Sequence, residues 1–89
     1  MSNKVSWREM FVEEFEETGD NFENTVITLS QEELDVKFDS GYGATEGQEF
    51  TAWSKDWVYF PICYDGSEWI GRVSRNPNGK ATPHQGGGY

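Results

Sequence analysis

Apolar residues near the start of the chain recur three and four positions apart, which is the spacing of an amphipathic helix. Ser6 followed by Glu9 is a capping box, so the helix is predicted to begin at Trp7, and Gly19 is predicted to end it. The apolar arc of this helix consists of Trp7, Met10, Phe11 and Phe15. The opposite side carries Glu9, Glu13, Glu16 and Asp20. Glu14 falls inside the apolar arc, which predicts that it lies at the rim or meets a basic partner.

The hydrophobic period then changes from about 3.6 to 2 residues, which indicates strands. Thr25–Leu29 is a short run rich in β-branched residues, and Leu34–Asp39 alternates apolar with charged residues. Glu49–Ser54 is a further candidate strand. The glycine-containing stretch from Ser40 to Gly43 is predicted to end the second of these strands.

A β-hairpin is the clearest element of the second half. Asp65-Gly66 supplies residues that tolerate positive φ, and it separates the predicted strands Trp57–Tyr64 and Glu68–Ser74. Pro61 has no N–H to donate to a strand ladder. We therefore expect this strand to lie at an edge or to bulge at Pro61.

These elements predict an α+β fold in which one N-terminal helix packs on a three- to five-stranded, mostly antiparallel sheet. Residues 1–75 form the predicted compact domain. Residues 76–89 are rich in glycine, proline and other turn-forming residues and nearly devoid of apolar ones, so we interpret them as a flexible tail. At 89 residues the chain is short for a hydrophobic core, but its aromatic content of 16% supplies large rings to fill one.

Cysteine content and apolar runs indicate the compartment. Cys63 is the single cysteine, which excludes an internal disulfide and a multi-cysteine zinc site. The first ten residues lack the apolar region of a signal peptide, and no run approaches the ~20 apolar residues of a membrane span. We therefore expect a soluble cytoplasmic protein without membrane contact.

Enzymatic sites find little support in the sequence. Cys63 lies in a predicted strand and His84 in the tail, and no third residue is placed to orient them as nucleophile and base. The many carboxylates single out no acid–base pair. We therefore expect a protein that is not an enzyme.

The carboxylates and glycines in the middle of the chain are candidates for a ligand site. Carboxylates flank the glycines of DSGYGATEGQE, which leaves a small calcium-binding domain as an alternative, although the spacing of an EF-hand is absent. The carboxylates concerned are Asp35, Asp39, Glu46 and Glu49. The same glycines lack the Lys-Ser/Thr ending of a phosphate loop. We expect no bound metal or cofactor, and no direct binding of nucleic acid because the aromatics are not accompanied by a basic groove.

The acidic charge is concentrated in one half of the chain. The net charge is −9, and residues 1–50 carry thirteen acidic against three basic residues, whereas residues 51–89 carry three against four. Five carboxylates between Glu9 and Glu17 are spaced at about 2.4 Å along a helix axis. Duplex DNA carries one charge per ~1.7 Å. The acidic helix is therefore either a solvated face or a surface that docks on a basic site built for nucleic acid.

In size, charge and compactness the chain resembles the small acidic proteins by which bacteriophages block host DNA-binding machinery, among them anti-CRISPR and anti-restriction DNA mimics. The resemblance is one of type and carries over no residue. It implies stoichiometric blocking of a basic surface on a host defence nuclease or transcription protein. The alternative is a general interaction module, adaptor or antitoxin-like, that uses the aromatic hairpin. The candidate partner-binding residues are Glu9, Glu13, Glu14, Glu16, Glu17, Asp20, Glu23, Trp57, Tyr59 and Trp69.

Overall fold

The computed structural model describes residues 4–39, 47–64 and 67–84. The N-terminal helix α1 spans Trp7–Thr18, with the predicted bounds. Ser6 caps it by accepting a hydrogen bond from the N–H of Glu9 at 3.3 Å. Gly19 ends it in the left-handed conformation, at φ 82°, and donates its N–H to the carbonyl of Phe15. Local capping chemistry therefore determines both ends of α1.

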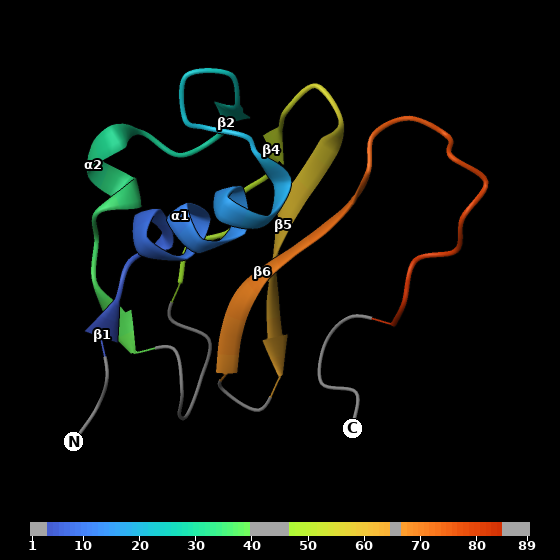
Figure 1. The fold of residues 1–89 in the computed structure, drawn as a ribbon. Coiled ribbons are helices and arrows are strands. Elements are labelled where there is room, and N and C mark those ends of the chain that lie inside the picture. The colour runs from blue at the N-terminus through green and yellow to red at the C-terminus, as the bar shows by residue number, and fades with distance from the viewer. Residues whose placement is uncertain (1–3, 40–46, 65–66, 85–89) are drawn as a thin grey trace.

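The other elements of the described residues are one short helix and six strands, and the strands form two antiparallel sheets. A two-stranded sheet pairs β1 with β3, and a four-stranded sheet has the order β2-β4-β5-β6. The elements are β1 (Lys4–Val5), β2 (Val26–Ile27), α2 (Gln31–Leu34), β3 (Phe38–Asp39), β4 (Ala52–Trp53), β5 (Trp57–Tyr64) and β6 (Ser67–Ser74). Figure 1 shows α1 beside the long β5–β6 hairpin and the chain leaving β6 as an extended loop. The expected α+β fold is confirmed.

The hairpin is paired along its whole length, from Trp57 with Ser74 to Tyr64 with Ser67. This register leaves Asp65 and Gly66 as the two connecting residues, and their own conformation lies outside the described residues. Alternation along the strands gives the four-stranded sheet two faces. We call the face that packs on α1 the inner face and the opposite one the outer face.

The core lies between α1 and the inner face. Phe11 is fully buried, and its ring centroid lies 5.2–6.0 Å from the rings of Phe15, Phe22, Phe50 and Tyr59. These aromatic contacts confirm that the arc predicted from the helical wheel is the buried side of α1. A few large rings thus supply most of the apolar area that a chain of this length needs.

The predicted strand Leu34–Asp39 is wrong in its first half. Ser30 and Glu33 form a complete capping box, which starts the helical turn α2, and Leu34 is buried as the last residue of that turn. Val36 is 53% exposed, and pairing with β1 begins only at Phe38. The capping box at Ser30 therefore determines the local structure in place of the short alternating pattern that predicted a strand.

The other two predicted strands exist in shortened form. Within Thr25–Leu29 only Val26–Ile27 is strand, and within Glu49–Ser54 only Ala52–Trp53. Their ends still contribute to burial, because Leu29 and Phe50 belong to the core. Each segment therefore contributes side chains to the core but only two residues to the sheet.

Pro61 and the segment after β6 complete the fold. β4 pairs only with Val58 and Tyr59 of β5, so Pro61 faces no described strand on the side away from β6. This agrees with a locally edge-like position for a residue that cannot donate. Residues 75–84 contain no helix or strand (Figure 1). They are exposed throughout. No helix of the described residues has the length and apolar character needed to cross a membrane.

Candidate protein-binding surface

Carboxylates extend along the solvent side of α1. Glu13, Glu16 and Glu17 are exposed, and their spacing of three and four residues places them next to one another on the helix. We call these three residues the acidic face. Glu23, in the loop that follows α1, is exposed as well.

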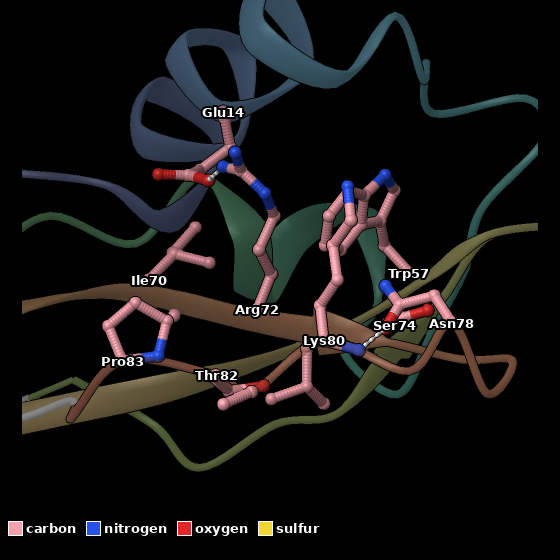
Figure 2. Close-up of a pocket in the computed structure, with 12 residues that line it drawn as sticks. Glu14, Trp57, Ile70, Arg72, Ser74, Asn78, Lys80, Thr82 and Pro83 are labelled. Atoms are coloured by element: carbon pink, nitrogen blue, oxygen red, sulfur yellow. Dashed lines mark hydrogen bonds and ion pairs between the residues drawn. The ribbon is translucent and has the colours of Figure 1, made fainter.

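Arg72 connects α1 to the hairpin, although no sequence pattern singled it out. Its guanidinium donates from Nη1 to Glu14 Oε2 at 2.5 Å and from Nη2 to Glu17 Oε1 at 3.4 Å. The same guanidinium stacks over the ring of Trp57, with the Cζ atom 4.9 Å from the ring centroid. Figure 2 shows Arg72 reaching from the sheet to Glu14, with Trp57 close by. The placement of Glu14 within the apolar arc was the available signal, since it predicted either a position at the rim or a basic partner, and the structure shows the partner.

The charge state of Arg72 is secured by this arrangement. Burial disfavours the charged guanidinium, but hydrogen bonding and Coulombic attraction from Glu14 and Glu17 outweigh that effect, so the pKa of Arg72 is raised. The pair with Glu14 is partly buried, because the two side chains are 26% and 21% exposed. Arg72 therefore neutralises Glu14 and shares Glu17, which remains 65% exposed.

Two further ion pairs neutralise acidic groups at the N-terminal end of α1. Lys37 Nζ binds Glu9 Oε1, and this hydrogen bond is the main reason that the pKa of Glu9 is lowered. Arg8 Nε donates to Asp35 Oδ1 at 2.5 Å. Glu9, although a candidate contact residue, is thus already paired within the chain.

Tyr59 lies in the core, which removes it from the candidate contact residues. It is fully buried on the inner face, and its hydroxyl donates to Asp20 Oδ2 at 2.5 Å and lies 2.9 Å from Thr18 Oγ1. Burial first, and then the hydrogen bond with Asp20, raise the pKa of Tyr59. The interaction anchors the C-terminal end of α1 to β5, so Asp20 has a structural partner as well.

The two candidate tryptophans of the hairpin lie on opposite faces of the sheet. Trp57 pairs with Ser74 on the inner side, beside Arg72, and Trp69 pairs with Ile62 on the outer face. Both are partly exposed. The structure therefore brings Trp57 together with the carboxylates of α1 and separates Trp69 from them.

A groove of about 430 Å³ lies next to the Arg72–Trp57 stack. Five consecutive residues of β6, from Ile70 to Ser74, line one side, and Asn78 and Lys80–Pro83 line the other (Figure 2). Glu14 and Trp57 close its end toward the helix. The segment after β6, interpreted from the sequence as a tail, therefore borders the region where the helix and hairpin candidates meet.

The other acidic residues of α1 and of the loop after it have no basic partner among the described residues. Within residues 4–39, 47–64 and 67–84, the exposed residues Glu13, Glu16 and Glu23 form no ion pair. Glu9, Glu14 and Glu17 each have a basic partner. The uncompensated charge of α1 is thus concentrated at Glu13 and Glu16 and extends to the exposed, shared Glu17.

For metal ions, the described residues contain no group of three or more His, Cys, Asp and Glu side chains that could hold one. Of the four carboxylates considered for calcium, Glu46 lies outside the described residues, and so does the side chain of Asp39. Comparison of the chain with protein-family models, curated proteins and solved structures finds no match.

Proposed function

We propose that this chain is a non-catalytic binding protein that docks its acidic face on a basic surface of a nucleic-acid-binding protein and blocks that surface stoichiometrically. A host defence nuclease or transcription protein in the cytoplasm of a bacterial cell is the expected class of target. In this role the chain would act as the small acidic phage proteins do, with carboxylates in place of phosphates.

One observation carries the proposal: the described cations pair with Glu9 and Glu14 and share Glu17, and they leave Glu13 and Glu16 on the solvent side of α1 without an ion pair. Arg72 and Lys37 are used on Glu14 and Glu9, while Glu13 and Glu16 have no cation among the described residues. Three neighbouring carboxylates at helical spacing repel one another, which costs the fold a few tenths of a kcal/mol per pair. A basic partner would relieve that repulsion and would be steered to the surface by the same charges.

Trp57 would add an anchor to this surface. Its ring is partly exposed and is held by the Arg72 guanidinium, so it adopts a fixed orientation before binding. Tryptophan is enriched among residues that dominate binding energy at interfaces. The acidic face would thus attract the partner and orient it, and Trp57 would add apolar contact at the margin of this face.

The test combines a charge-neutral variant with salt. Immobilised protein captures partners from a bacterial lysate at about 50 mM and about 500 mM NaCl, with Glu13→Gln/Glu16→Gln/Glu17→Gln compared against wild type. We expect the wild type to retain nucleic-acid-binding proteins at low salt, duplex DNA to displace them, and the triple variant to bind roughly 100-fold more weakly, at about 1 kcal/mol per lost pair.

The matched control changes the net charge by the same amount elsewhere. Glu32, Glu49 and Asp56 are exposed and lie off α1, so Glu32→Gln/Glu49→Gln/Asp56→Asn should retain full binding. Equal loss in both variants would show that only total charge matters. Unchanged binding by the first variant, with the same salt dependence as wild type, would refute the proposal.

A further inference from the structure

The outer face of the four-stranded sheet is apolar along all of its strands. A row of aligned residues crosses the sheet at one end: Val26, Trp53, Val58 and Val73. Toward the hairpin turn the face continues with Phe60, Ile62, Trp69 and Tyr64. No charged side chain of the described strands points to this side. In antiparallel sheets with one covered face, the second face is normally polar.

Packing contacts show that these side chains form a cluster separate from the core. A Cβ on Gly71 would come within 2.3 Å of Ile62 Cδ1 and 2.9 Å of Phe60 Cε2, so both side chains lean over this glycine. Ile62 is only 7% exposed, yet it is not part of the core beneath α1. Phe60 and Ile62 therefore form an organised apolar layer on the outer face.

This layer remains in contact with solvent. Val26, Trp53 and Tyr64 are 68%, 37% and 44% exposed. No described helix packs on the layer. Asn78 and residues 80–83 border it along the β6 edge, where they line the groove together with Gly71 and Val73. Contiguous apolar patches of this kind mark interaction surfaces.

We propose that the outer face is the interface of a homodimer in which two copies pack sheet on sheet. Charge favours a second copy as the occupant. The chain has a net charge of −9, but its acidic face lies on the other side of the sheet, so contact between two uncharged outer faces keeps the carboxylates of the two copies apart. The contact is isologous, so each residue of the patch serves both copies.

The area of the outer face limits how tightly two copies can bind. Eight-residue strands are about 26 Å long, and three strands spaced ~4.8 Å apart span roughly 10–15 Å, which gives each copy about 350 Å² of projected area. Stable interfaces bury ~800 Å² of accessible surface on each partner. We therefore expect a dimer that forms in the micromolar range and dissociates on dilution.

The experiment measures molar mass against concentration by sedimentation equilibrium, from about 5 µM to about 500 µM. The wild type should rise from its monomer mass of 10.2 kDa toward twice that value. Trp53→Lys/Tyr64→Lys should shift the dissociation constant upward by at least ~10-fold, because it places charge in the interface of both copies. Both side chains are exposed, so the fold should be retained, which circular dichroism checks; Trp53→Ala serves as a milder second variant.

Val12→Lys is the matched control. Val12 is an exposed apolar residue, 47% accessible, but it lies on α1, so this variant should dimerise like the wild type. A wild type that stays monomeric at the highest concentration would overturn the proposal, as would a folded double variant that dimerises unchanged. Salt separates this inference from the proposed function: added NaCl should strengthen the dimer by screening repulsion, and it should weaken docking of the acidic face.

Discussion

The inner and outer faces of the β5–β6 hairpin carry different chemistry on the same two strands. Two polar side chains of the inner face are bound to α1 or the loop after it: Tyr59 to Asp20, and Arg72 to Glu14 and Glu17. The outer face has no charged side chain and no covering helix among the described residues. Under the two proposals above, the hairpin would separate two functions: its inner face stabilises the monomer and positions the carboxylates, and its outer face would bind a second copy.

The largest expected difference between the faces concerns stability. Phe11→Ala should lower the free energy of unfolding by ~3–5 kcal/mol, because it opens a cavity in a core where Phe11 is fully buried. Phe60→Ala, on the outer face, should cost about 1 kcal/mol, because Phe60 is already partly hydrated. Urea denaturation at low micromolar concentration measures both; similar losses would mean that the outer layer is as important to the monomer as the core.

Tyr59 makes the inner face sensitive to alkali. Its pKa is raised in the fold above the ordinary value of 10.0, so its contribution to stability is complete below pH 10 and is lost as pH rises beyond it. The loss cannot exceed about 1.4 kcal/mol per pH unit. Urea midpoints at rising pH should fall more steeply for the wild type than for Tyr59→Phe, which has no proton to lose. Parallel curves would contradict this assignment.

Arg72→Met should destabilise the fold by about 1–2 kcal/mol, because it leaves the partly buried Glu14 carboxylate without its partner. It should also free Trp57, which is measurable as a change in tryptophan fluorescence. Lys4→Met removes the same charge from an exposed position on β1, outside the groove that borders Trp57, so it should leave both quantities unchanged. Equal effects of the two variants would assign the stabilisation to net charge instead of to the Arg72 contacts.

The smallest effect is expected on the solvent side of α1. Glu13→Gln/Glu16→Gln should change the free energy of unfolding by less than about 0.5 kcal/mol, toward greater stability, because like charges at this spacing repel. Glu14→Gln, at the residue next to Glu13, should destabilise the fold instead, because it weakens the ion pair with Arg72. Thermal denaturation of both variants tests whether the acidic face is dispensable for folding.

Elements defined by local chemistry were predictable from the sequence. Ser6 and Gly19 determined the ends of α1, and Asp65-Gly66 located the hairpin, whose second strand begins at Ser67, one residue before the predicted Glu68. The segment from Leu34 to Asp39 was misassigned because a helical turn and a short strand present the same two inward residues, Leu34 and Phe38. The short strands β2 and β4 also depend on partners distant in the sequence, which no local pattern specifies.

The candidate surface was predictable in part. The carboxylates of α1 follow from helical periodicity, and Glu9, Glu13 and Glu16 lie exposed as expected, whereas Asp20 is half-buried. The pairing of Arg72 with Glu14 spans 58 residues, so only the fold reveals which carboxylates are neutralised. Tyr59 and Trp69 were grouped with Trp57 by sequence proximity, whereas the alternation of strands places them in the core and on the outer face.

The pairing of β1 with β3 has a consequence for the order in which the chain folds. The β5–β6 hairpin closes eight residue pairs across a two-residue connection, whereas β1 and β3 form two pairs between segments more than thirty residues apart. Closing the longer loop costs more entropy and is rewarded by fewer contacts. In pulsed hydrogen exchange, we expect amides of β5 and β6 to gain protection first and those of Val5 and Phe38 last. Under native conditions the same two amides should exchange through local opening, long before the hairpin does.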